Sequence, residues 1–280
     1  MLAHLRKSAS GVFGFVVILV FVLLGIFADV ISPYPPDKQA LDQKLLPIAC
    51  MEGGDRAHPL GTDQLGRDIL SRLIYGSRVS ILIALGGTAL AGVIGFIMGA
   101  IAGYYGKIAD TVIGRIMDIN LAFPFILLGI FVVAILGAGV DKIILIAGVT
   151  GWVRFARVVR GEILSIKEME YVEAIRSLGG KDSRIIIRHI LPNLVSPFTV
   201  IATLDLAKVI LMEASLSYLG MGVPPQVPTW GRMLAESSNY LQTAAHLVIL
   251  PGLTISLLVL GVNLFGDWLR DFMDPKLDTN

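Results

Sequence analysis

Two carboxylates in a short polar stretch are the first candidates for chemistry. Asp63 and Asp68 each follow a glycine-containing turn. Paired carboxylates act as general acid and base where their surroundings drive their pKa values apart, usually by burial in an apolar site. No apolar sequence encloses these two residues. We therefore expect structural turns held by the aspartate side chains, and contact with an external protein is the second interpretation.

The pair Gly106-Lys107 resembles part of a phosphate-binding loop. The full pattern needs glycine at position 101 and Ser or Thr at position 108, where this chain has Ile101 and Ile108. We therefore predict no nucleotide site of this type. Cys50 is the single cysteine and the four histidines stand far apart, so we predict no intrachain disulfide, no metal site, no catalytic residue and no cofactor.

Three charged residues, Asp205, Lys208 and Glu213, stand in an otherwise apolar stretch. If this stretch crosses a membrane, each charge at the bilayer centre costs about 2.5–3.5 kcal/mol, so these side chains must face protein or water. The spacing of Asp205 and Lys208 places them on one helix face, where they can neutralise each other. Two roles stay open for the three residues: a helix–helix seam, or the lining of a path across the membrane.

Long uncharged stretches must position these residues. Only 16% of the residues are charged, whereas a soluble domain has about 25%. A helix needs about 20 apolar residues to cross the hydrocarbon core. Four uncharged runs have about this length and are predicted spans: Val12–Ala28, Val79–Gly103, Ile119–Val140 and Leu247–Gly266.

Two further spans are expected over Ile143–Val153, before Arg154, and over Asn193–Leu204, before Asp205. Either of them is also compatible with a re-entrant segment or a buried helix. The predicted fold class is an all-α membrane protein with six transmembrane helices. We interpret the first apolar run as a retained span, because Asp29–Pro33 offers no signal-peptidase site.

Lys and Arg are enriched in cytoplasmic loops. An even number of spans places both termini on one side, and more of the basic residues fall on that side than on the other. We therefore expect both termini in the cytoplasm. The net charge of +1 gives no electrostatic case for binding nucleic acid.

The predicted inner loop, about residues 154–192, contains a short amphipathic helix. Tyr171, Ala174, Ile175 and Leu178 recur with helical spacing and form an apolar stripe. Gly179-Gly180 can end this helix in the left-handed conformation. A second helix, Ser183–Ile190, is expected to stop at Leu191-Pro192. The alternative is a helix that lies on lipid headgroups, but anionic headgroups repel its acidic first turn.

Glu173-Ala174, then Gly179, then Leu191-Pro192 at these offsets resemble the "EAA loop" of bacterial ABC importer permeases. The departures are small, since Ile175 replaces the second alanine and His189 stands where isoleucine is usual. The resemblance implies that these residues dock into a groove on a separate ATPase subunit and couple it mechanically to the membrane helices.

Three other segments narrow the resemblance to the C-type subunit of dipeptide, oligopeptide and nickel permeases: His58–Gly76, Glu213–Gly231 and Asn263–Pro275. This family implies a type I ABC importer permease fold in the bacterial inner membrane. The implied partners are a homologous B-type permease subunit, two ATPase subunits, an external solute-binding protein and membrane lipid. The implied substrates are di- or oligopeptides, and nickel or another small solute is the alternative.

The expected organisation has three parts: an N-terminal region with the first span and an external loop, 1–75; a transmembrane core, 76–267; and a cytoplasmic tail, 268–280. Gly95, Gly99 and Gly103 form a small-residue ridge for close helix packing, and Pro124 and Pro251 are expected to kink their helices. Less favoured interpretations are a stand-alone secondary transporter, with Asp205 and Glu213 as coupling groups, and an intramembrane enzyme, for which no catalytic constellation is present.

Overall fold

The computed structural model describes residues 2–6, 8–179 and 181–273, and these parts of the chain are helical apart from loops and one isolated bridge between Thr62 and Asp68. The helices are α1 (Leu2–Leu5), α2 (Ala9–Ile26), α3 (Ala28–Ile31), α4 (Ile69–Tyr105), α5 (Lys107–Ala122), α6 (Phe125–Leu136), α7 (Val140–Lys167), α8 (Glu170–Ser177), α9 (Asp182–Ile185), α10 (Leu191–Tyr218), α11 (Trp230–Ser237) and α12 (His246–Met273). A π-helical turn, Ile186–Ile190, joins α9 to α10, and a 3-10 turn, Ser238–Tyr240, follows α11.

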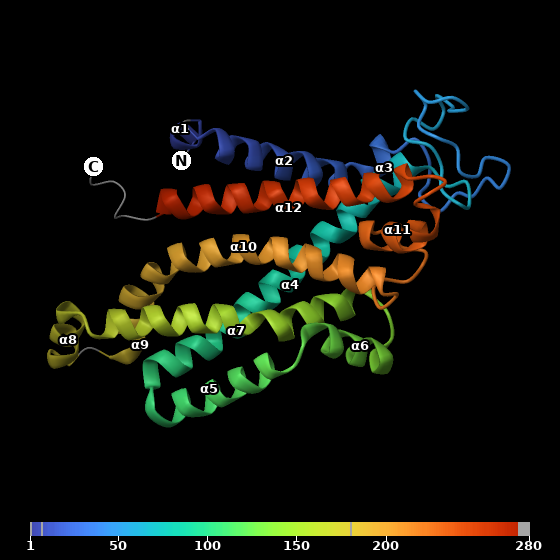
Figure 1. Ribbon diagram of the computed structural model, residues 1–280. Coiled ribbons are helices and arrows are strands. Elements are labelled where there is room, and N and C mark those ends of the chain that lie inside the picture. The colour runs from blue at the N-terminus through green and yellow to red at the C-terminus, as the bar shows by residue number, and fades with distance from the viewer. Residues whose placement is uncertain (1, 7, 180, 274–280) are drawn as a thin grey trace.

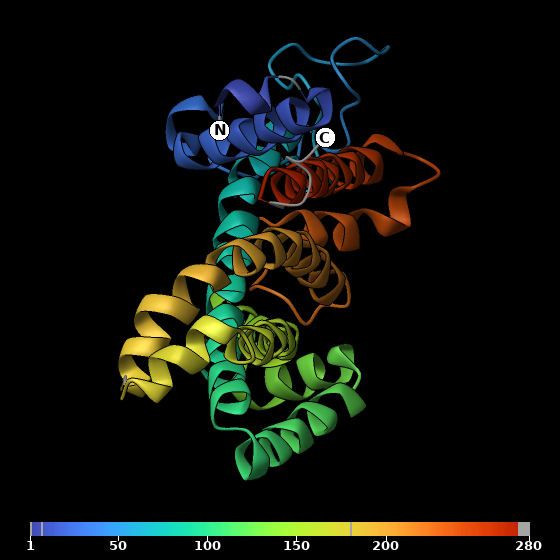
Figure 2. The ribbon, with the colours of Figure 1, turned by 90° about the vertical axis from the view of Figure 1, so that its left-hand side faces the viewer.

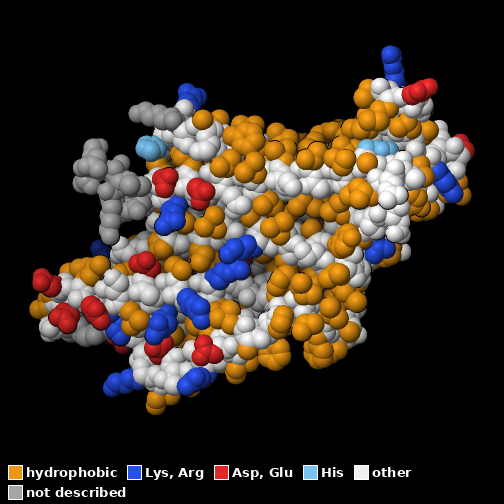
Figure 3. Space-filling model, in the orientation of Figure 1, with side chains coloured by type: hydrophobic (Ala, Val, Ile, Leu, Met, Phe, Trp, Pro, Cys, Tyr) orange, Lys and Arg blue, Asp and Glu red, His pale blue; other side chains and the backbone are white. Residues whose placement is uncertain are grey.

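The long helices form a slab with two different ends (Figure 1). The loop between α3 and α4, together with α11, lies at one end, and α1, α8, α9 and the end of α12 lie at the other. Helix α4 crosses behind α7 and α10 in Figure 1. Viewed along the slab, α2 and α12 lie side by side, and α5 and α6 form the edge opposite them (Figure 2). Charged side chains gather toward the α8 end, whereas apolar side chains cover much of the remaining visible surface (Figure 3).

Four of the described helices or helix runs are long and apolar enough to cross a membrane: α2, α4, the run Ile186–Tyr218, and α12. A fifth is obtained only if α5 and α6 count together as one span. The predicted count of six is therefore not confirmed. The span expected at Ile143–Val153 is the first half of α7, whose hydropathy is lowered by its three arginines.

The span predicted over Ile119–Val140 is wrong as a single helix. The chain breaks between α5 and α6, whose axes are bent by 86°. Pro124 causes the break, because proline drives the residue before it away from helical geometry, and Phe123 is extended (φ −91°, ψ 123°). The expected kink at Pro124 is thus a complete interruption. Pro251, in contrast, lies inside α12, which continues beyond it.

The predicted glycine ridge packs within the chain, against α7. A Cβ atom at Gly99 would lie 2.5 Å from the carbonyl oxygen of Ala156, and one at Gly103 would lie 3.0 Å from that of Arg160. Small residues permit this backbone approach, and closely packed helices gain dispersion energy where lipid supplies no hydrophobic driving force. The ridge therefore fixes α7, which carries Arg154, against α4.

Helix α11 is anchored to the slab by Trp230, whose side chain is fully buried. Its indole N–H donates to the carbonyl oxygen of Leu73 at 3.0 Å, and its ring meets Phe21 edge-on at 5.5 Å. Gly76 leaves the space that the indole occupies. This contact joins α2, α4 and α11 at the end of the slab that carries the long loop.

Candidate functional site

Helix α8 presents its predicted apolar stripe to the outside. Tyr171 is 42% exposed and Leu178 is 88% exposed, Ala174 is also exposed, and Ile175 is half-buried. The residue that fastens α8 to the chain is Val172, which is fully buried beside residues of α7 and the π-helical turn. The stripe is therefore available for contact with another molecule.

The acidic groups of α8 are also uncovered. Glu173 lies next to Ala174 and is exposed, and Glu170 stands in the same first turn. Acidic side chains in a first turn complement the partial positive charge of a helix N-terminus. The helix ends at Ser177, and Gly179 follows with φ +80°, the left-handed conformation predicted for it. Gly180 lies outside the described residues.

The predicted stop at Leu191-Pro192 is wrong, because the helical chain continues through it. The N–H of Leu191 bonds to the carbonyl of Ile186 in the π-helical turn, and α10 begins at Leu191 itself. Proline is tolerated in a first helical turn, where its missing N–H would have no intrahelical partner. The π-helical turn and α10 therefore form one helical run, Ile186–Tyr218, which passes through Pro192.

Two contacts tie this loop to the end of α4. The hydroxyl of Tyr104 donates to the carboxylate of Asp182, and the Lys167 ammonium donates to the Tyr104 carbonyl at 2.6 Å. The first contact joins α9 to α4, and the second joins the end of α7, from which the chain enters α8, to α4.

The charged residues of α10 have different surroundings. Asp205 is buried, and its Oδ1 accepts from Nη1 of Arg154 on α7 at 3.0 Å. Its expected partner was Lys208, but Arg154 forms the ion pair instead. Lys208 is exposed and lines the same cavity as Asp205 and Arg154, about 400 Å³ in volume. Apolar residues of α6, α7 and α10 form much of the remaining wall.

Glu213 lies in a seam between helices. It is 1% exposed, and its carboxylate accepts from Ser217 on its own helix at 2.7 Å and from Ser80 on α4 at 3.4 Å. It is not among the residues that line the cavity of Asp205. The three charges that the sequence groups together thus belong to two different places.

At the opposite end of the slab, Asp63 and Asp68 hold structural turns, as predicted. Asp63 Oδ1 accepts from the backbone N–H of Leu65 and of Arg67, and Asp68 Oδ2 caps α4 by accepting from the N–H of Ser71 at 2.8 Å. Both carboxylates are nevertheless buried, and the side chains that bond them are polar: Arg67 and Arg72 for Asp63, and His58 and Ser71 for Asp68. His58 covers Asp68 and bonds it through Nδ1 at 2.9 Å.

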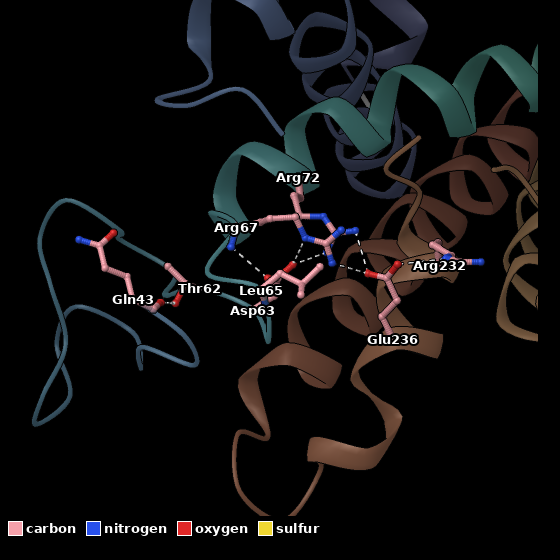
Figure 4. A network of polar contacts seen from close by, with 8 residues as sticks. All are labelled: Gln43, Thr62, Asp63, Leu65, Arg67, Arg72, Arg232 and Glu236. Carbon is pink, nitrogen blue, oxygen red and sulfur yellow. Dashed lines mark hydrogen bonds and ion pairs between the residues drawn. The ribbon is translucent and has the colours of Figure 1, made fainter. Parts of the chain in front are cut away.

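Arg67 and Arg72 extend from the Asp63 turn to Glu236 on α11 (Figure 4). They reach its Oε2 at 2.7 Å and 3.0 Å, while Arg232 donates to its Oε1 at 3.0 Å. Burial by itself raises the pKa of Glu236, but the attraction of Arg72 and Arg67 outweighs it, so this pKa lies below its ordinary value. The cluster fixes the long loop between α3 and α4 to α11.

Glu236, which joins three arginines, is not predicted from the sequence as a residue of this cluster. The available signal was the i, i+4 spacing of Arg232 and Glu236, which favours a helical ion pair. Nothing local points to the two arginines more than 160 positions earlier in the chain. Within the described ranges, no group of three or more His, Cys, Asp or Glu residues is arranged to hold a metal ion.

Two family models match this chain. Residues 93–279 match the model described as the binding-protein-dependent transport system inner membrane component, and residues 1–47 match the N-terminal transmembrane domain of oligopeptide transport permease C. The first of them covers α5 to α12 and therefore includes α8 and the cavity of Asp205.

Relatives align over almost the whole chain. The di/tripeptide transport system permease protein of Pseudomonas aeruginosa is 42% identical over 98% of this chain and 90% of the relative. The glutathione transport system permease protein of Pectobacterium atrosepticum is 40% identical over 96% and 86%, and the oligopeptide transport system permease protein of Bacillus subtilis is 37% identical over 97% and 87%.

Among solved structures, an inward-facing conformation of the MetNI methionine ABC transporter has the same fold. Its TM-score is 0.59 at 21% identity, and the match covers 72% of this chain and 96% of the other. This likeness supports the type I permease fold expected from the sequence. Together with the family match and the full-length relatives, it leads to one conclusion: this chain belongs to the family of binding-protein-dependent transport system inner membrane components.

Proposed function

We propose that this chain is one permease subunit of an ATP-driven importer of short peptides in a bacterial inner membrane. It forms the translocation path with a homologous permease subunit, receives substrate from an external binding protein, and is driven by two separate ATPase subunits. The peptide assignment rests on relatives whose names specify dipeptides, tripeptides, glutathione and oligopeptides. Nickel or another small solute is the alternative substrate.

The observation that carries the proposal is the uncovered face of α8. Tyr171, Glu173 and Ala174 are exposed on α8, which Val172 fastens to the chain, and Leu178 is exposed directly after the helix. A fastened helix with an exposed mixed apolar and acidic face is suited to a groove on another protein. Val172 packs α8 against α7, and Asp182 bonds α9 to Tyr104 of α4, and these contacts give a path for force into the membrane helices.

The proposed orientation follows from the position of α8. An ATPase in the cytoplasm must reach it, so the α8 end of the slab is the cytoplasmic end. Both termini then lie in the cytoplasm, because α1 and the end of α12 are at this end (Figure 1). The loop between α3 and α4 and helix α11 face the outside, where the binding protein docks. The remaining tail, 274–280, lies outside the described residues.

The cavity of Asp205 and Lys208 is proposed as part of the translocation path. A half-exposed arginine and an exposed lysine on helices at membrane depth must face water or protein, since lipid exposure is costly. Glu213, buried between α4 and α10, is assigned to the helix seam. We propose the same three parts of the chain as before: an N-terminal region, 1–75, a transmembrane core, 76–267, and a cytoplasmic tail, 268–280.

The test is peptide uptake into vesicles that contain the assembled transporter. We expect uptake only with ATP and binding protein, and we expect Glu173→Lys and Gly179→Pro to reduce it to background and to release the ATPase subunits during purification. Glu52→Lys, the same charge change at an exposed residue of the outer loop, is the matched control and should retain uptake.

Two results would contradict the proposal. Uptake that persists without any ATPase would identify a gradient-driven carrier. Full uptake and retained ATPase subunits in both α8 variants would show that α8 is not the coupling element.

A further inference from the structure

The cavity between α6, α7 and α10 has an unusual charge balance. Two cations line it, Arg154 and Lys208, and only one anion, Asp205. Asp205 is already bonded to Arg154 Nη1, and the Arg154 side chain stays 48% exposed beyond that bond. Lys208 has no hydrogen bond or ion pair with any residue in the described part of the chain. The cavity therefore has a net positive charge and unused N–H donors.

The walls strengthen the effect of these charges. Phe125, Val209 and Met212 are among the lining residues, and apolar walls lower the local dielectric constant, so that a charge interacts more strongly than it does in water. Phe125 is also the first residue of α6, which begins without a side-chain cap. The N–H groups of an uncapped first turn add to the positive potential.

The size of the cavity fits a small solute. Its volume is about 400 Å³, within the range of about 300–1,000 Å³ that is usual for small-molecule sites. A short peptide carries one carboxylate at its C-terminus and one ammonium at its N-terminus. The carboxylate matches Lys208 and the free side of Arg154, while Asp205 is the one acidic residue in the lining and has the sign that attracts the ammonium.

We infer that Lys208 and Arg154 bind the C-terminal carboxylate of the peptide in transit, so that the permease itself selects substrates with a free carboxylate. This inference rests on the proposed function as a peptide importer. Asp205 then has two tasks: it orients the Arg154 guanidinium, and it keeps the cavity from carrying two uncompensated positive charges.

The experiment compares the uptake of dialanine and dialanine amide, which differ in the carboxylate. The complete transporter, with its ATPase subunits and binding protein, is reconstituted into vesicles, and each peptide is supplied at a concentration that saturates the binding protein. The measured quantity is the ratio of the two uptake rates. Because every variant uses the same binding protein, the preference of that protein cancels when the ratios are compared.

A hydrogen bond to a charged group changes the binding affinity by about tenfold. We therefore expect Lys208→Gln to lower the dialanine preference by about tenfold, and Lys208→Arg, which retains the charge, to keep it. Lys142→Gln is the matched control, because Lys142 lies at the start of α7 outside the cavity, and it should behave as the wild-type protein does.

An unchanged ratio in Lys208→Gln, with ATP-dependent uptake intact, would overturn the inference and leave the proposed function standing. Loss of the partner permease from the purified Lys208→Gln complex would also overturn it, since Lys208 would then be a subunit contact. If the wild-type transporter imports neither peptide with ATP, the proposed function itself fails and the inference fails with it.

Discussion

Arg154 on α7 donates a hydrogen bond from Nη1 to Oδ1 of Asp205 on α10 at 3.0 Å, and the two partners are unequally buried. The Asp205 side chain is 2% exposed, whereas that of Arg154 is 48% exposed. The pair joins two long helices at one wall of the proposed path. Because the two side chains are buried to different extents, we expect their single substitutions to lower the stability of the protein by different amounts.

We expect Arg154→Ala to destabilise the protein more than Asp205→Ala does. The first change leaves a buried carboxylate without its cation, at a cost of about 1–3 kcal/mol or more. The second leaves an arginine that water already reaches. The measurement is thermal unfolding in detergent for both single variants and the double variant. Equal losses in the two single variants, with an additive double variant, would show that the ion pair has no part in stability.

Gly99→Leu should destabilise the contact between α4 and α7. Any side chain there meets the Ala156 carbonyl, which a Cβ atom would approach to 2.5 Å, and overpacking of this kind costs about 1–3 kcal/mol. Gly161→Leu is the control, because a Cβ atom at Gly161 on α7 meets nothing within 4 Å. The readout is the amount of folded protein by size-exclusion chromatography. Similar losses in both variants would contradict the close packing of this ridge.

The cluster at Glu236 predicts a pH dependence. Because the folded-state pKa of Glu236 is lowered, the stability it contributes is present above its ordinary pKa and is lost as the pH falls through the lower, folded value. Glu236→Gln should lower the melting temperature at pH 7, since two buried arginines lose one of their two carboxylate partners and keep only Asp63. The difference between wild type and variant should shrink as the medium becomes more acidic. A difference independent of pH would assign the effect to packing alone.

Much of this arrangement could be predicted from the sequence, because it depends on local spacing. The uncharged runs give α2, α4 and α12, and the glycine spacing gives the ridge that contacts α7. The aspartate turns and the left-handed Gly179 follow from side-chain chemistry within a few residues. These features require no knowledge of distant contacts.

The remaining features depend on contacts between distant parts of the chain. Spacing offers Lys208 as the partner of Asp205, but α7 brings Arg154 closer. Periodicity identifies the apolar stripe of α8, yet it cannot show that Val172, off this stripe, is the residue that packs inward. The sequence predicts that a helix ends at Leu191-Pro192. In the structure Pro192 lies in the first turn of α10, where proline is tolerated, and local sequence does not show where that turn begins.

The central claim is that α8 transmits force from an ATPase in the cytoplasm. Cys50, the single cysteine, is exposed in the loop between α3 and α4. It can be replaced by serine, and a new cysteine can be placed by Ala174→Cys on the exposed face of α8. The most direct measurement is cross-linking of this cysteine within the assembled transporter in inverted membrane vesicles, using a short maleimide–benzophenone reagent whose photoreactive arm needs no thiol on the partner. The account predicts a covalent product with an ATPase subunit, and no reaction of Ala174→Cys with a membrane-impermeant maleimide in intact cells. Labelling of this position from outside the cell, or the absence of any cross-link to the ATPase, would contradict it.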